Sequence, residues 1–451
     1  MHPKVRTACD RCYVLKERCQ RATPSAECGR CERLGLACST VRPVRPVGRR
    51  AHKKYGTDKR PQRTQPKTDQ ILTGLSDHDP EEKALLSFLL VQPGSLDHFV
   101  VCPSFQAEQQ HSLAVQLPTL PLLKDAFLAC AATLKHLQSG NADDLDAEAS
   151  IRYISKAVNA LRSLPASCLQ DAAVYHQVGS LLAFSIHSSI GAGVAEISRY
   201  CLSAASSIYN EVESGAHTDP WQSFLILQET MDCILYRQKP TIRINTSASS
   251  VVDRRLGLCL PLLPHYQDLC VISNSILYAA DVNELARLQK QLDDIRRVVE
   301  PWQPPNMDQL LERFESAEIV HLLAQAKLYR LGALLLGHRL RYPFGQQDAQ
   351  GQIWSREIFM ELEMAKRVTK RTMRFVTLPF VIAAVEAQGE LLRLQALQLV
   401  HDCVDQYAPS LQKVTKAFLS RIWHERDMNL TTCWFDSTYK PCPILNSING
   451  S

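Results

Sequence analysis

From about residue 80 onward, apolar positions recur with a period close to 3.6 residues, which predicts amphipathic helices. Alternating strand patterns are scarce, helix formers such as Leu, Ala, Gln and Glu are abundant, and Pro and Gly fall mostly between the periodic segments. We therefore predict a large all-α domain. The expected helices span 104–116, 119–137, 145–163, 168–188, 192–213, 219–238, 264–299 with a break, 307–340, 354–371, 376–405 and 408–427.

The first 80 residues lack this periodicity. Residues 39–70 are dominated by Pro, Gly and basic side chains, which predicts an extended linker without a packed core. The segment 70–92 offers one short helix that is apolar on all sides, so we expect it to pack into the helical body rather than form a coiled coil. The predicted organisation is a cysteine-rich domain at 1–39, a basic flexible linker at 40–79 and an all-helical domain at 80–451.

Charge divides the chain in the same place. Residues 1–68 carry 18 Lys and Arg against 5 Asp and Glu, whereas the remaining residues carry 33 against 41. A basic end of this kind predicts binding to a polyanion, and nucleic acid is the leading candidate. An anionic membrane is the alternative, although the basic end has no apolar anchor beside it. No secretory signal and no apolar run of about 18 residues is visible, which favours an intracellular protein with reduced cysteines.

Six of the sixteen cysteines occur in the first 38 residues with the spacing C-x2-C-x6-C-x8-C-x2-C-x6-C. The second trio repeats the first at an offset of 19, which indicates an internal duplication. In a reducing compartment such a pattern favours metal over disulfides, since a structural zinc takes four ligands. The other interpretations are a disulfide framework, a single zinc knuckle and a metal-storage peptide. The six candidate ligands are Cys9, Cys12, Cys19, Cys28, Cys31 and Cys38.

Six thiolates can complete two tetrahedral sites only if two of them bridge both metals. The duplication makes the first cysteine of each half, Cys9 and Cys28, the expected bridges. The first zinc would then take both bridges with the other two cysteines of the first half, and the second zinc would take both bridges with those of the second half. Two Zn²⁺ and six thiolates carry a charge of −2, which nearby Arg and Lys would offset.

The segment Ala8–Cys12, together with Lys16 and Pro24, resembles the DNA-binding domain of fungal binuclear zinc cluster (Zn2Cys6) transcription factors. The resemblance covers about 35 residues. It implies a nuclear, sequence-specific regulator of RNA polymerase II genes that binds two zinc ions per chain. It also implies an all-helical regulatory domain that contacts the transcription machinery or co-regulators, and it favours an activator of a specific pathway, including pathways of secondary-metabolite gene clusters.

The residues between the second and third cysteine of each half, 13–18 and 32–37, are long enough for one or two helical turns that enter a major groove. The resemblance implies that Lys16 reads guanines of a CGG-like triplet, which suits an ammonium donor facing guanine O6 and N7. Since only Lys16 and Arg18 are basic in the first of these segments, binding of a protein partner without base readout remains the alternative function. The expected phosphate contacts are Arg18, Arg11, Arg6 and Arg21.

The linker holds closely spaced basic pairs that suit a nuclear import signal or contacts to phosphates beside the cluster. The leucine spacing over 285–299 is too short for a dimer seam and favours core packing, so a homodimer is open rather than indicated. No nucleotide-binding, nucleophile-elbow or metalloprotease motif is present, which argues against an enzyme. The candidate import residues are Arg49, Arg50, Lys53, Lys54, Lys59 and Arg60.

Overall fold

The computed structural model divides the chain into two compact units, Met1–Thr64 and Gln65–Ser451. The described residues are 8–14, 18–23, 26–39, 79–91, 95, 97–109, 121–138, 144–164, 168–189, 194–211, 220–244, 252–304, 307–405 and 407–434. The linker predicted at 40–79 lies outside this set apart from Asp79, as do all six candidate import residues.

The first unit contains two one-turn helices, α1 (Asp10–Val14) and α2 (Gly29–Arg33). Each begins one residue after the first cysteine of its half. The helical turn predicted at 32–37 is therefore wrong, because α2 starts three residues earlier and ends at Arg33. The turn predicted at 13–18 lies partly outside the described residues.

The reason for this earlier start is a cap made by sulfur. The Sγ of Cys28, the N-cap residue, accepts a hydrogen bond from the backbone N–H of Cys31, as an oxygen does in an ordinary N-cap. At the other end Gly35 has φ +59, and this left-handed residue ends the turn. The buried side chains of the described part of this unit are all cysteines, namely Cys9, Cys12, Cys28 and Cys31.

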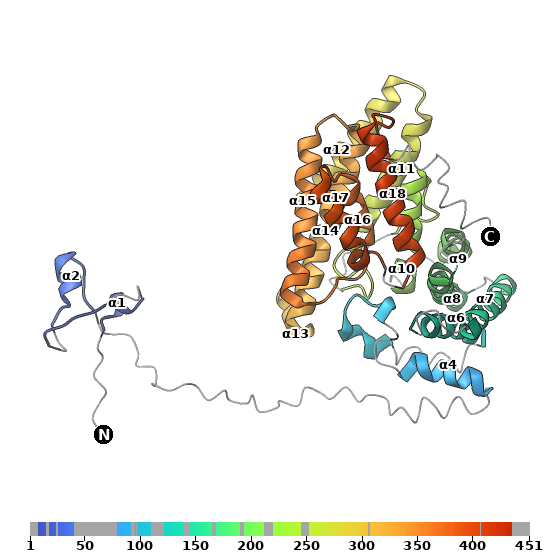
Figure 1. Cartoon of the computed structure of the whole chain (residues 1–451), viewed down its shortest axis with the longest axis horizontal. Helices are drawn as coiled ribbons and strands as arrows, with labels where there is room; N and C mark the ends of the chain where they lie inside the picture. Colours follow the sequence, from blue (N-terminus) through green and yellow to red (C-terminus); the bar gives the residue numbers. More distant parts are fainter. Residues whose placement is uncertain are drawn as a thin grey trace. The chain divides into compact units, whose positions relative to one another are not determined.

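The described part of the second unit is helical and contains no strand, which confirms the predicted all-α class. Figure 1 shows its helices packed into one body. They are α4 (Pro80–Val91), η1 (Asp97–Phe99), η2 (Pro103–Phe105), α6 (Pro121–Gln138), α7 (Asp144–Ser163), α8 (Leu169–Ser189), α9 (Val194–Glu211), α10 (Pro220–Tyr236), η3 (Leu260–Leu262), α11 (Leu263–Tyr278), α12 (Val282–Val299), α13 (Met307–Arg313), α14 (Ser316–Arg341), α15 (Asp348–Thr369), α16 (Thr377–Val385), α17 (Glu390–Cys403) and α18 (Pro409–Asp427).

Three predicted helices are divided by breaks with a local cause. The segment 264–299 breaks where the Asp281 carboxylate accepts the N–H of Glu284 at 2.7 Å and starts α12. The segment 307–340 breaks at a capping box formed by Glu315 and Glu318. The segment 376–405 divides into α16 and α17, and the helix predicted at 104–116 is described only as far as residue 109.

Helix α14 is the centre of the C-terminal part of this unit. It packs against α11, α12, α15 and α16, and 16 of its 26 residues are buried. A helix that is buried on all sides must be apolar on all sides. Its length and composition would also suit a membrane span, but 72% of the apolar window is buried inside the protein, as in the core helix of a soluble domain.

A buried ion pair joins α14 to the end of α16. The guanidinium of Arg339 donates to both carboxylate oxygens of Glu386, at 2.7 and 2.6 Å, and the two side chains are 2% and 1% exposed. Asp348 at the start of α15 adds a contact of 2.9 Å. Gly351 makes room, since a Cβ there would lie 2.9 Å from the Arg339 Nη2 atom.

We expect Glu386→Ala to lower the free energy of unfolding of the helical unit by roughly 3–5 kcal/mol, because it leaves the buried Arg339 charge uncompensated. Urea unfolding followed by circular dichroism measures this change. The matched control is Arg297→Ala, which breaks an exposed pair with Asp294 and should cost about 0–1 kcal/mol. Equal losses in the two variants would contradict the central role of the buried pair.

Candidate metal centre

The six candidate cysteines of the first unit come together in two sets of four. In each set the sulfur atoms lie within 4.8 Å of one another. Cys9 and Cys28 belong to both sets, so they occupy the shared positions that the duplication predicts. The first set adds Cys12 and Cys19, and the second adds Cys31 and Cys38.

The distances between sulfur atoms suit tetrahedral zinc. A tetrahedron with Zn–S bonds of ~2.3 Å has edges of ~3.8 Å. The Sγ atoms of Cys9 and Cys28 are 3.8 Å apart, and this pair forms the edge common to both sets. The Cys12–Cys28 edge of the first set is 3.7 Å, and the Cys9–Cys31 edge of the second is 3.8 Å. The donor set therefore fits two zinc ions that share two thiolates.

Backbone N–H groups surround the two shared sulfurs in matching ways. The Cys9 sulfur accepts the N–H of Cys12 at 3.4 Å, and the Cys28 sulfur accepts the N–H of Cys31 at 3.4 Å. Both bonds close the first turn of a short helix. A hydrogen bond donated to a sulfur favours its charged form, which is the form that binds metal.

The third cysteine of each half receives a corresponding bond. The N–H of Cys9 donates to the Cys19 sulfur at 3.3 Å, and the N–H of Cys28 donates to the Cys38 sulfur at 3.4 Å. The two halves are thus equivalent at the level of single hydrogen bonds. A duplication in the sequence has produced two loops that fold around their sulfurs in the same way.

The shared and unshared cysteines also differ in acidity. Burial opposes ionisation of Cys9, but the N–H and thiol of Cys12 and the thiols of Cys28 and Cys31 donate to its sulfur, so its pKa is lowered to about 6. The N–H of Cys31 likewise lowers the pKa of Cys28. Burial and the neighbouring thiols raise the pKa of Cys12 to about 12. The two bridging positions are therefore the ones at which the protein itself stabilises a thiolate.

Two peptide hydrogen bonds join the halves. The N–H of Asp10 donates to the carbonyl of Ser39 at 2.8 Å, and the N–H of Gly29 donates to the carbonyl of Gln20 at 3.2 Å. These pairs are related by the same offset of 19 residues. The Ser39 hydroxyl also donates to the Asp10 carboxylate at 3.1 Å. Motif matching missed this clasp, although extending the repeat from the cysteines to every position would have indicated it.

Arg21 lies against the cluster. Its Nη2 donates to the Cys38 sulfur at 3.3 Å. Burial lowers the pKa of Arg21, but the sulfurs of Cys38 and Cys19 outweigh it and produce a net rise. The sequence suggested a phosphate contact for this residue, whereas the structure turns its guanidinium toward the thiolates, where it offsets part of the −2 charge.

The other candidate DNA contacts are distributed differently. Arg11 on α1 and Arg18 just before Cys19 are exposed, so both are available to a phosphate backbone. Lys16 and Arg6 lie outside the described residues. The cysteines of the helical unit form no second centre within the described residues, and burial raises the pKa of thiols such as Cys130 and Cys201, which makes them unreactive.

Two protein-family models match the chain. Residues 7–46 match the fungal Zn(2)-Cys(6) binuclear cluster domain, and residues 101–442, about three quarters of the chain, match the fungal specific transcription factor domain. No curated protein and no solved structure matches the chain significantly. The matches confirm the resemblance and the two zinc ions, and neither domain is enzymatic.

We expect Cys28→Ala to release both zinc ions, because this sulfur belongs to both ligand sets. The zinc content of the purified full chain, measured by elemental mass spectrometry, should fall from two ions per chain toward none. Cys168→Ala, which removes an exposed cysteine of the helical unit, is the control and should keep both ions. Retention of one fully bound zinc in Cys28→Ala would rule out the bridging arrangement.

We expect Arg21→Gln to weaken zinc binding by roughly 10–100-fold, since groups that hydrogen-bond to metal ligands tune affinity to this extent. Competition with a chromogenic zinc chelator measures the effect. Arg18→Gln removes an exposed arginine of the same unit and should leave zinc affinity unchanged. If Arg21→Gln impairs DNA binding with normal zinc affinity, the guanidinium serves phosphate rather than the cluster.

Proposed function

The chain belongs to the family defined by the fungal specific transcription factor domain and carries a zinc cluster DNA-binding domain, and from this premise we propose that it is a sequence-specific regulator of RNA polymerase II genes. One observation carries the proposal. A cluster built on the shared sulfurs of Cys9 and Cys28 holds a strongly basic segment in a defined shape beside exposed arginines. Its partner is double-stranded DNA.

Affinity and specificity come from different residues in this proposal. Arg11 and Arg18 neutralise phosphates, which supplies sequence-independent and salt-sensitive affinity. Lys16 supplies direct readout by donating to the O6 and N7 acceptors of guanine in a CGG-like triplet. Because Arg21 is engaged by the cluster, its contribution to DNA binding is indirect: it keeps the thiolate cage intact.

The arrangement of the chain supports a division of labour. We propose a DNA-binding domain at 1–39, a flexible basic linker at 40–79 and a regulatory domain at 80–451. The basic pairs of the linker, from Arg49 to Arg60, serve nuclear import and place the protein in the nucleus. The regulatory domain contacts the transcription machinery or co-regulators, and a homodimer would place two cluster domains on paired half-sites.

The direction and target of regulation follow from the family. We propose an activator of one pathway, with the genes of a secondary-metabolite cluster as the first targets to examine. A genome-wide binding profile, read together with expression in a deletion strain, tests both points. Loss of expression at bound genes supports activation, and increased expression at those genes indicates a repressor.

We expect Lys16→Ala to reduce affinity for a CGG-containing duplex by about 1–3 kcal/mol, because one guanine-specific contact is lost. Affinity for a random duplex should change much less, since phosphate contacts remain. Fluorescence anisotropy at one fixed salt concentration compares the two duplexes.

Arg18→Ala is the matched control and should weaken binding to both duplexes by a similar factor. An equal loss on both duplexes for Lys16→Ala would remove that residue from base readout. If the zinc-loaded protein enriches no sequence from a random pool, the alternative function, binding of a protein partner, is favoured.

A further inference from the structure

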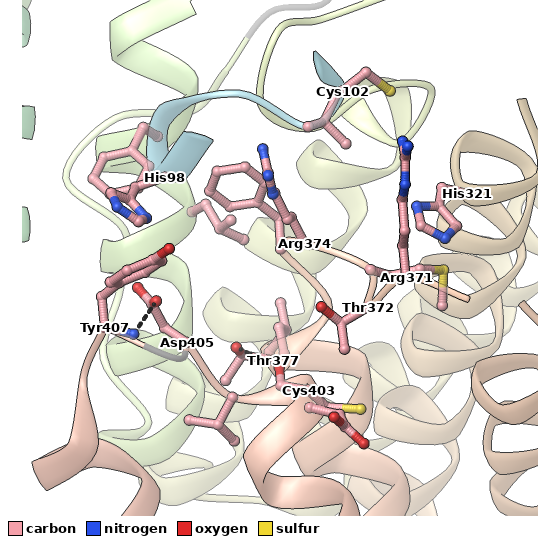
Figure 2. Close-up of a pocket in the computed structure, with 18 of the residues that line it drawn as sticks. His98, Cys102, His321, Arg371, Thr372, Arg374, Thr377, Cys403, Asp405 and Tyr407 are labelled. Carbon is pink, nitrogen blue, oxygen red and sulfur yellow. Dashed lines mark hydrogen bonds between the residues drawn. The ribbon is translucent and has the colours of Figure 1, made fainter. Parts of the chain in front are cut away.

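A pocket of about 450 Å³ lies within the helical unit, where segments far apart in the sequence meet. It is lined by η1, α8, α10, the start of α14, the loop before α16 and the loop before α18. Figure 2 shows ten of its side chains, most of them polar, arranged around a common space. Its volume is in the range of small-molecule sites, which is ~300–1,000 Å³.

One wall of the pocket is apolar and rigid. Phe224, Leu227 and Met231 line it from a single face of α10, at the i, i+3, i+7 spacing of a helix. The Tyr329 ring from α14 belongs to the same lining, and its hydroxyl is held by the carbonyl of Phe375 at 2.8 Å. This wall suits the hydrophobic body of an organic molecule.

Two of the three acidic side chains in the lining are already neutralised. The Glu318 carboxylate accepts the N–H and hydroxyl of Ser104, at 2.7 and 2.6 Å, and the N–H of Glu315 at 2.9 Å. Asp402 pairs with Lys366 at 2.6 Å. Neither carboxylate therefore presents an uncompensated negative charge to the pocket.

The third acid, Asp405, is buried next to His187. Burial raises its pKa, while His187, the N–H of Tyr407 and Arg374 act in the opposite direction. The Tyr407 N–H donates to its Oδ1 at 3.0 Å, and Figure 2 marks this bond. A carboxyl group whose pKa is raised repels a second carboxylate less than a fully ionised one.

The positive charges lie on one short loop. Lys370, Arg371 and Arg374 all contribute to the lining, and Figure 2 shows the side chains of Arg371 and Arg374 extending in the same direction, with Arg371 beside His321. Arg374 donates to the carbonyl of Val100 at 3.3 Å, which helps to hold it in place. Within the described residues, Lys370 and Arg371 have no carboxylate within ion-pair distance.

The backbone of this loop is unusual as well. Lys370 and Phe375, which bracket the arginines, have φ of +59 and +55, a conformation that side chains with a Cβ rarely adopt. Strained residues of this kind cluster at ligand sites, because the surrounding structure must hold them there. The loop is therefore a built feature that presents cations to a partly apolar cavity.

The histidines of the lining add hydrogen-bonding groups rather than charge. Burial lowers the pKa of His98 and of His187, although Asp405 opposes the effect at His187. Burial together with Arg371 and Arg374 lowers the pKa of His321. The uncommitted charge of the pocket is thus positive and comes from Lys370 and Arg371.

We propose that this pocket binds a small organic carboxylate with an apolar body. The carboxylate is held by Arg371 and Lys370 beside Arg374, and the body lies against the wall formed by Phe224, Leu227 and Met231. A bidentate guanidinium contact suits a carboxylate in geometry as well as charge. The proposal concerns the helical unit alone and stands or falls independently of DNA binding by the cluster.

The test uses the zinc-loaded full chain and three probe acids, 4-phenylbutyrate, naphthaleneacetate and dodecanoate, each with its neutral primary amide. Binding is measured by ligand-observed nuclear magnetic resonance. At least one acid should bind, and its amide should bind roughly tenfold more weakly or less, because the charge-assisted contact is absent. Arg371→Met and Lys370→Met should each weaken binding of that acid by a similar factor.

Arg367→Met is the matched control, since it removes an exposed arginine of α15 that does not line the pocket, and it should leave binding unchanged. DNA binding is measured in the same preparations and should be unaffected by all three substitutions. The proposal is overturned if none of the acids binds, if acid and amide bind equally, if Arg371→Met binds normally, or if inorganic phosphate displaces the acid at equal concentration.

Discussion

The sharing of two thiolates between two metal sites is the constraint on which DNA binding by this chain depends. The cluster unit has no hydrocarbon core in its described part, and its buried side chains are cysteines. A segment this short cannot bury enough apolar surface to fold by itself, so metal binding must supply the folding free energy. The shared Cys9–Cys28 edge makes both halves depend on one another, and the clasp from Asp10 to Ser39 closes the loop around them.

The helical unit is stabilised in a different way. Its core is extensive and centred on α14, and its buried Arg339–Glu386 pair satisfies charges that would otherwise be costly. Chelation of zinc and denaturation by urea should therefore act on separate parts of the chain. This separation allows the body to carry a strained loop and a polar pocket, since a large core can hold unfavourable backbone conformations that a small cluster cannot.

Much of the fold could be predicted because each helix of the body records its buried face in local sequence. The errors arose where a single hydrogen bond outweighs periodicity. Asp281 and Glu315 divide apolar runs that look continuous, since their side chains cap new helices. In the cluster, the sulfur of Cys28 starts α2 earlier than residue type alone suggests. Arg21 resembles any other basic residue in the sequence, and only the fold turns it toward Cys38.

The sequence by itself determined the metal centre, because a repeat of cysteines at an offset of 19, with six ligands for two tetrahedral ions, leaves two shared positions that equivalence assigns to Cys9 and Cys28. It also determined the all-α class through the period of its apolar positions. Only the tertiary structure decided the pocket. His98, His321, Arg371 and Asp405 are separated by long stretches of chain, and no local pattern can encode which helices bring them together, because that choice is made by packing across the whole core.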